Sequence, residues 1–99
     1  MPELINELLA TEGAIDKLGA RGISISEAAQ LIWNRHVVIK NRRGSVDRPQ
    51  RKTRRLLIGT SDSRRSLTLV IEETVEPTTW LLVTGWESTL AERTIMEKA

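Results

Sequence analysis

Hydrophobic residues recur at helical spacing in the first third of the chain and at strand spacing after it. Pro2, followed by Glu3 and Glu7, is typical of a helix start, because proline fits the first turn and carboxylates favour the positive end of the helix dipole. An apolar stripe continues from there, with an interruption at Gly13, through Leu4, Ile5, Leu8, Ile15 and Leu18. The pattern predicts a first helix that ends at the GARG segment, residues 19–22.

A second helix is predicted directly after this stop. Ser24 and Glu27 have the spacing of a capping box, in which each side chain bonds the backbone N–H of the other residue. The apolar residues that follow would lie on one helix face: Ile25, Ala28, Ala29 and Ile32.

From residue 36 the pattern has period two, and it predicts four strands, at residues 36–40, 55–60, 66–73 and 80–87. Residues 61–65 (SDSRR) and 76–79 (EPTT) have the composition of turns. Such short connections require consecutive strands to be antiparallel. By the same alternation, Trp80 and Trp86 are expected on one face of the last strand.

Thr89 and Glu92 repeat the capping-box spacing, and we expect a short closing helix with Leu90, Ala91 and Ile95 on its apolar face. The predicted fold is therefore an α+β domain with two N-terminal helices, a four-stranded antiparallel meander and a short C-terminal helix. The helices would pack on one sheet face. Residues 1–99 are expected to form a single domain, since this length supports one core and not two.

Charge is strongly segregated along the chain. Residues 1–34 carry a net charge of −3 and residues 56–99 also carry −3, whereas residues 35–55 have nine Lys or Arg against Asp47 alone, a net +8. This local excess indicates a site for a polyanion, of which nucleic acid is the commonest. A solvated loop without a ligand is the alternative explanation.

Guanidinium groups match phosphate oxygens in two-point geometry, so the cations of this segment are candidate phosphate contacts. Two further arginines in the predicted turn at 61–65 could join them if that turn lies on the same sheet edge. The predicted nucleic-acid-binding set is Arg42, Arg43, Arg51, Lys52, Arg54, Arg64 and Arg65.

His36 is the one side chain that titrates near neutrality without help, and it begins a predicted strand beside the basic segment. It could act as general acid or base, or it could be an ordinary strand residue. Trp33, Trp80 and Trp86 are the only aromatic residues. They could stack on unpaired bases, although packing is the expected role of Trp80 and Trp86.

Composition excludes several other functions. The chain has no cysteine, so it has neither disulfides nor thiolate chemistry, and with one histidine a zinc site would depend on carboxylates. We expect no metal and no other cofactor. The N-terminus lacks the pattern of a signal peptide and no run of eighteen apolar residues occurs, so a cytoplasmic protein without membrane association is expected.

Several segments, in their order and spacing, resemble the BrnT-like toxins of type II toxin-antitoxin systems, which belong to the RelE-like group of small ribonucleases. The resemblance covers about residues 14–98 and rests on GIS at 22–24 with EAAQLIW at 27–33, on RRLLIG at 54–59, and on LLVTGWESTLAERTIMEK at 81–98. The order of the predicted elements agrees with the layout of that family.

The resemblance implies an endoribonuclease that arrests translation and is covered by a neighbouring antitoxin, commonly a ribbon-helix-helix protein. Operator DNA would be bound only through that antitoxin. Metal-free cleavage at the RNA 2′-hydroxyl needs a base, an acid and cations around the phosphate. Together with His36, the resemblance makes these the candidate catalytic residues: Arg21, His36, Arg55 and Arg93.

The sequence departs from the family pattern at four positions. Arg21 stands where the family tends to have His, Thr60 and Trp86 stand where it has Arg, and Met96 replaces a Tyr. Arginine is a very poor proton carrier because it stays protonated in proteins. Two functions are therefore open: a toxin-like ribonuclease with activity that is retained, reduced or lost, and a non-catalytic module of the same fold that binds nucleic acid or a protein.

Overall fold

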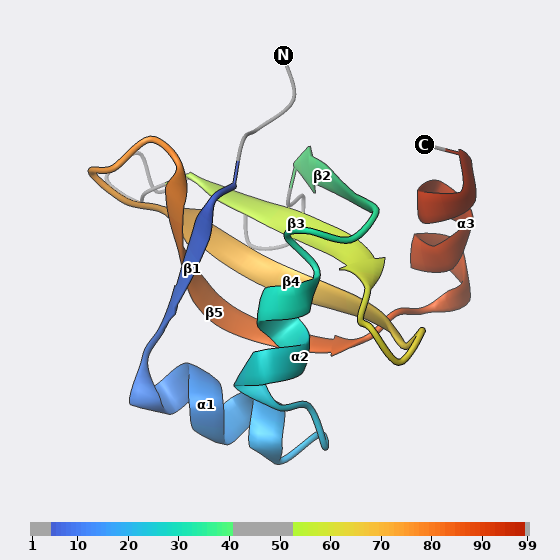
Figure 1. The fold of residues 1–99 in the computed structure, drawn as a ribbon, viewed down its shortest axis with the longest axis horizontal. Coiled ribbons are helices and arrows are strands. Elements are labelled where there is room, and N and C mark those ends of the chain that lie inside the picture. Colours follow the sequence, from blue (N-terminus) through green and yellow to red (C-terminus); the bar gives the residue numbers. More distant parts are fainter. Residues whose placement is uncertain (1–4, 41–52, 99) are drawn as a thin grey trace.

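Five strands and three helices form the described part of the chain in the computed structural model, which describes residues 5–40 and 53–98 (Figure 1). In chain order the elements are β1 (Glu7–Ala10), α1 (Glu12–Gly19), α2 (Ile25–Gln30), β2 (His36–Lys40), β3 (Arg54–Thr60), β4 (Ser66–Glu73), β5 (Thr79–Glu87) and α3 (Leu90–Lys98). The predicted α+β class is confirmed, and so are the four predicted strands, to within one residue at their starts.

The sheet has five strands in the order β1-β5-β4-β3-β2, and it is mixed rather than antiparallel. β2 to β5 form the expected antiparallel meander. β1 adds to its far side in parallel with β5, with Leu8 opposite Trp80. The predicted four-stranded antiparallel sheet is therefore too small by one strand.

The prediction of a helix that starts at Pro2 is wrong for residues 7–10. Residues 1–4 lie outside the described part, but β1 is extended, and Leu8 and Ala10 turn toward the core while Glu7 and Leu9 are exposed. The local sequence is compatible with both a helix and a strand here, and pairing with β5 stabilises the strand. The first helix begins only after Thr11, whose hydroxyl accepts from the Ala14 N–H at 3.1 Å.

Other local predictions are confirmed. The Ser24–Glu27 capping box begins α2. The box at Thr89–Glu92 is also formed, with the Thr89 N–H donating to Glu92 Oε1 at 2.8 Å and the Glu92 N–H to Thr89 Oγ1 at 3.2 Å. Ala28 in α2 is fully buried, as is Leu31 directly after the helix. The predicted apolar face included Ala28 but omitted Leu31.

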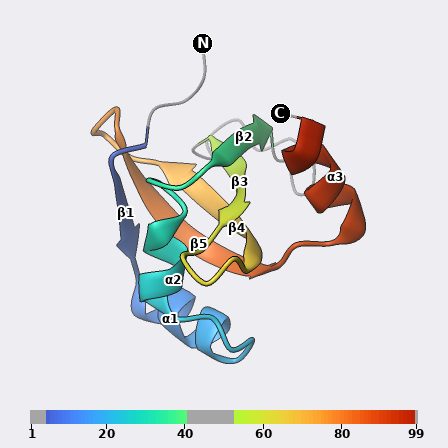
Figure 2. The ribbon, with the colours of Figure 1, turned by 45° about the vertical axis from the view of Figure 1, so that its right-hand side comes forward.

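The helices lie on both faces of the sheet, contrary to the prediction of one covered face. α1 and α2 cover the face that carries Leu67 and Leu69, and at Gly85 a methyl group would come within 2.9 Å of Leu18 of α1 and 2.6 Å of Leu69. α3 binds the alternate residue Thr68 on the other face. Figure 2 shows α3 separated from α1 and α2. Of α3, Met96 is buried, while Leu90 and Ile95 of its predicted apolar face are exposed.

Trp80 and Trp86 lie on opposite faces of β5, so the prediction that they share a face is wrong. The register between β4 and β5 shifts at Val70, which pairs with Thr84, whereas the next residue, Ile71, pairs with Leu82. One residue of β5 is therefore extra, and a bulge of this kind reverses the alternation of side chains. Trp80 joins the core, and Trp86 donates to Glu92 of α3.

Candidate nucleic-acid interface

The basic segment joins two neighbouring strands. β2 ends at Lys40 and β3 pairs with it so that Lys40 lies opposite Arg55. Both ends of the segment 41–52 therefore lie at one corner of the sheet, which we call the basic corner and define by Lys40, Arg54 and Arg55. The predicted contacts Arg42, Arg43, Arg51 and Lys52 lie outside the described residues.

At the basic corner, Arg54 pairs with a carboxylate. Its Nε donates to Glu72 Oε1 at 3.0 Å across the β3–β4 pair, in a half-exposed position. Arg55 projects from the opposite face, the one that carries Leu57, and its Nη1 donates to the Arg54 carbonyl at 3.0 Å. Exposed ion pairs contribute little free energy, so the Arg54–Glu72 pair leaves Arg54 able to exchange Glu72 for a phosphate.

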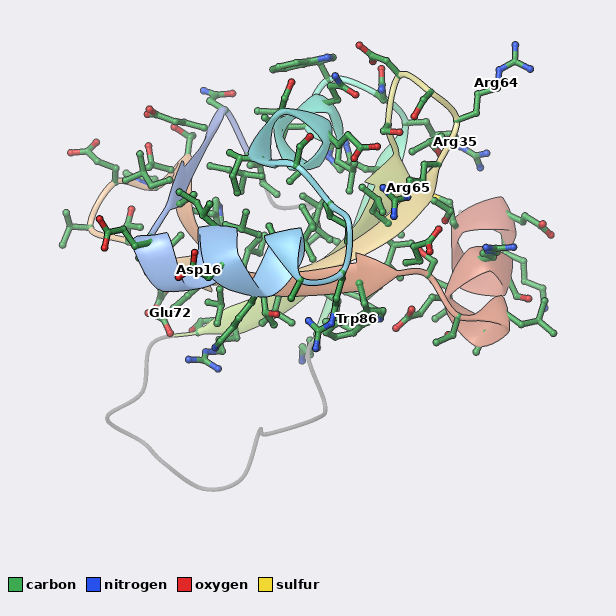
Figure 3. The ribbon with its side chains drawn as sticks, turned by 90° about the horizontal axis from the view of Figure 1, so that it is seen from below. Asp16, Arg35, Arg64, Arg65, Glu72 and Trp86 are labelled. Carbon is green, nitrogen blue, oxygen red and sulfur yellow. The ribbon has the colours of Figure 1, made fainter. Side chains whose placement is uncertain are left out.

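Arg64 and Arg65 sit in the β3–β4 hairpin, as predicted, but they point in different directions (Figure 3). Arg65 turns inward: its Nη1 donates to the Gly22 carbonyl at 2.8 Å and to Glu27 at 3.1 Å, and its Nε to Glu87 at 3.3 Å. The hydrogen bond with Glu87, then the charges of the two carboxylates, raise the pKa of Arg65. Arg64 is exposed at the hairpin tip.

Arg21 lies at the edge of the sheet. Its Nη1 donates to the Gly85 carbonyl at 2.8 Å and to Thr84 Oγ1 at 3.0 Å. β1 pairs with β5 only as far as Leu82, so Arg21 satisfies a backbone carbonyl beyond the end of β1. This contact gives Arg21 a structural role that does not depend on any ligand.

His36 begins β2 on the same face as Arg55. Its Nδ1 lies 2.9 Å from the Asn34 carbonyl, and since a carbonyl can only accept, Nδ1 carries the proton. In the neutral ring Nε2 is then the acceptor, the form a general base needs. Gly59 opposite is necessary here, because a methyl group on it would come within 2.9 Å of His36 Cβ.

The candidate catalytic residues are spread over the molecule. His36 is opposite Gly59, four residues from Arg55 along β3, which corresponds to about 13 Å. Arg21 reaches β5, three strand spacings or roughly 14 Å from β2. Arg93 lies on α3, over the other face. General acid–base chemistry needs its groups within about 3 Å of the reacting atoms, and the strand register does not place these residues around one phosphate.

A group that sequence reasoning did not identify is formed by the turn between α2 and β2 and by the β3–β4 hairpin. Asn34 Nδ2 donates to the Thr60 carbonyl and to Asp62 Oδ1, and the Asp62 N–H donates to Gln30 Oε1, all at 2.9 Å. We call residues 30–36 and 60–65 the turn–hairpin block. The sequence does not indicate these contacts, because Asn34 and Gln30 are ordinary surface residues by type and their partner, Asp62, lies about 30 positions away.

Arg35 also belongs to the turn–hairpin block, and its Nη2 donates to the Met96 carbonyl at 3.1 Å near the end of α3. Trp33 is the exposed tryptophan, with 66% of its surface accessible against 5% for Trp80. The structure thus separates the three tryptophans into one in the core, one against α3 and one on the surface.

Glu92 is a second residue whose role the sequence showed only as a helix cap. Its Oε1 also accepts from Trp86 Nε1 and Thr68 Oγ1, each at 3.0 Å. Burial acts to raise the pKa of Glu92, but the hydrogen bonds from Thr89, Trp86 and Thr68 outweigh it and lower the pKa below 4.5. The carboxylate stays ionised at neutral pH and holds α3 on the sheet.

Within residues 5–40 and 53–98, no group of three or more His, Asp or Glu is arranged to hold a metal ion. Over the same residues, no helix is long and apolar enough to cross a membrane. Comparisons of the chain with models of protein families, with curated proteins and with solved structures find no match.

Proposed function

We propose that the protein binds nucleic acid, with single-stranded RNA as its ligand and the basic corner as the main phosphate contact. The observation that carries the proposal is the net charge of +8 over residues 35–55, together with the pairing of Lys40 and Arg55, which fixes both ends of that segment at one sheet corner. A dense, local positive charge on an otherwise acidic chain suits a polyanion.

The salt dependence of binding tests this proposal. If about six phosphates of a single strand are neutralised, the logarithm of the association constant falls with the logarithm of salt concentration with a slope near −4. A labelled single-stranded RNA titrated at several salt concentrations gives this slope, and a slope near zero would reject the proposal.

A pair of matched variants locates the contact. Replacing Lys40 and Arg55 by Gln should make the slope less steep by about 0.7 for each phosphate contact removed. Lys17→Gln, which removes an exposed cation from α1 in the acidic part of the chain, serves as the control and should leave the slope unchanged. Equal effects of both changes would mean that binding follows net charge and has no particular site.

RNA cleavage, as a toxin of a toxin-antitoxin pair, is the second candidate function. The contact of His36 Nδ1 with the Asn34 carbonyl, which leaves Nε2 uninvolved in that bond, favours it, together with the resemblance of residues 14–98 to BrnT-like toxins. The candidate residues lie far apart, which favours binding without cleavage. Purified protein should cleave RNA but not a 2′-O-methyl analogue if the attack comes from the 2′-hydroxyl.

Expression of the protein alone and with the product of the adjacent reading frame tests the toxin proposal further. A toxin should slow growth, and a ribbon-helix-helix antitoxin should relieve that effect. His36→Gln should remove cleavage while leaving binding intact. Intact RNA after long incubation with the wild-type protein, combined with normal growth, would leave the binding function alone.

A further inference from the structure

Trp33 is exposed on the surface, and the turn that carries it is fixed by hydrogen bonds. The backbone on both sides of it is hydrogen-bonded, with the Ile32 N–H donating to the Ala29 carbonyl at 3.3 Å and the Asn34 N–H to the Gln30 carbonyl at 3.2 Å. The turn is then attached to the hairpin by the three bonds of the turn–hairpin block. An indole two-thirds exposed on such a frame is an available flat surface.

The turn–hairpin block that carries Trp33 has more arginines than carboxylates. Arg35 is two positions from Trp33 in the sequence. Asn34, the residue after Trp33, bonds Asp62, and Arg64 is two positions from Asp62. Asp62 is the one carboxylate of the turn–hairpin block, against Arg35, Arg64 and Arg65, of which Arg65 is paired with Glu27 and Glu87 outside the block. Figure 3 shows the Arg64 side chain projecting from the hairpin tip, away from the sheet.

Arg64 occupies a backbone conformation that favours glycine. Its φ is +66°, in the left-handed region, and the hairpin places it at the end of a turn closed by the Arg64 N–H to the Ser61 carbonyl at 2.9 Å. A left-handed residue at this point of a hairpin is usually Gly, because side chains are disfavoured there by about 1–2 kcal/mol. The sequence nevertheless has a cation at this position, in the same turn–hairpin block as Trp33.

From these observations we infer that Trp33 is a base-stacking residue, and that Arg64 and Arg35 receive the phosphates on either side of the stacked base. The ligand is an unpaired nucleobase within a single strand, since only an unstacked base offers its face to an indole. The inference rests on the proposed RNA binding and adds a second contact point, at the opposite end of β2 from the basic corner, about 13 Å along the strand.

The direct test compares Trp33→Leu and Trp33→Phe with the wild-type chain. The probe is labelled oligouridylate of about 12 nucleotides, within the range of known single-strand sites. Trp33→Leu should weaken binding by roughly 5- to 150-fold, the effect of losing one stacked base, and Trp33→Phe should keep most of the affinity. Val75→Ala removes another exposed apolar side chain, 90% accessible, and should change nothing.

Inorganic polyphosphate, a polyanion without bases, separates stacking from charge. Its binding should be equal in the wild type and Trp33→Leu, because an indole neutralises no phosphate. The emission of wild-type protein should be quenched by oligouridylate, and this quenching should be lost in Trp33→Phe. The quenching measurement remains decisive if Trp33→Leu does not fold.

The outcomes distinguish the two proposals. If the wild type binds oligouridylate and Trp33→Leu binds it equally well, the stacking site is rejected while RNA binding stands. If Trp33→Leu weakens polyphosphate binding by the same factor, Trp33 acts through the fold or the charges, and the stacking site is again rejected. If the wild type binds neither probe, the proposed RNA binding itself is rejected.

Discussion

Glu92 shows how one side chain can position a whole helix. Three donors converge on its carboxylate: the Thr89 N–H, Trp86 Nε1 and Thr68 Oγ1. Ser88 Oγ lies 2.9 Å from Thr68 Oγ1 and extends the group. Because the folded state favours the ionised form, the pKa of Glu92 is lower folded than unfolded. Its contribution to stability is complete above pH 4.5 and is lost as the pH falls through the lower, folded pKa.

Glu92→Gln should therefore reduce the free energy of unfolding at pH 7 by about 1–3 kcal/mol, since charged hydrogen bonds are replaced by neutral ones. It should also remove part of the destabilisation that appears as the pH falls below 4.5. Urea unfolding at a series of pH values measures both effects. Glu97→Gln, an exposed change one helical turn or so later, is the control, and an equal loss in that variant would contradict the assignment.

Substitution of Arg64 should change the free energy of unfolding in the opposite direction, toward greater stability. Arg64→Gly relieves the left-handed strain and should raise the free energy of unfolding by about 1 kcal/mol. The same substitution removes a proposed phosphate contact, so single-stranded RNA should bind more weakly. Thermal unfolding and RNA titration on one preparation check both. A variant that is both less stable and unchanged in binding would remove the functional reason for an arginine at this position.

At the scale of the element, the strand conformation of β1 can be tested through its side chains, which alternate between the core and solvent. Leu8 faces the core and Leu9 the other side. Leu8→Gln should cost about 1–3 kcal/mol and shift Trp80 emission toward that of an exposed indole, because Leu8 lies opposite Trp80 in the sheet. Leu9→Gln should have an effect within about 0.5 kcal/mol. Equal effects would contradict the strand.

The elements also show why sequence predicted some structures and not others. β4 is predicted with its bounds because Leu67, Leu69 and Ile71 share one face between two turns, and both capping boxes fix helix starts by local bonds. β1 is only four residues long, and its state depends on a partner far along the chain. The bulge in β5 has no marker such as Gly at the extra residue, so the face of Trp86 could not be predicted.

For the candidate site, the sequence predicts where positive charge accumulates but not which arginines are available to a ligand. The distribution of charged residues along the chain locates the excess of cations in residues 35–55. Whether an arginine is exposed or bonded internally depends on tertiary contacts, as Arg65 and Arg21 show by their carbonyl and carboxylate partners. The turn–hairpin block arises from the meeting of two segments about 30 residues apart, which no local pattern indicates.

The molecule as a whole separates its charges. The N-terminal and C-terminal thirds are each acidic, and the basic segment leaves the sheet at one corner. Acidic surfaces elsewhere repel a nucleic-acid strand, so they would restrict the proposed RNA binding to the basic side and disfavour non-specific wrapping. A single strand that follows β2 from the turn–hairpin block to the basic corner would use this side along its length.

The parallel pairing of β1 with β5 has a consequence for how the protein is made. Glu7 pairs with Thr79, so β1 is synthesised about 70 residues before its partner and cannot be incorporated until β5 has left the ribosome. The meander from β2 to β5, in which each strand follows its neighbour, can form during synthesis, whereas β1 can join the sheet only after β5 is available. Until then the outer edge of β5 is open, and that interval is when a nascent chain of this fold is most exposed to pairing with the wrong strand.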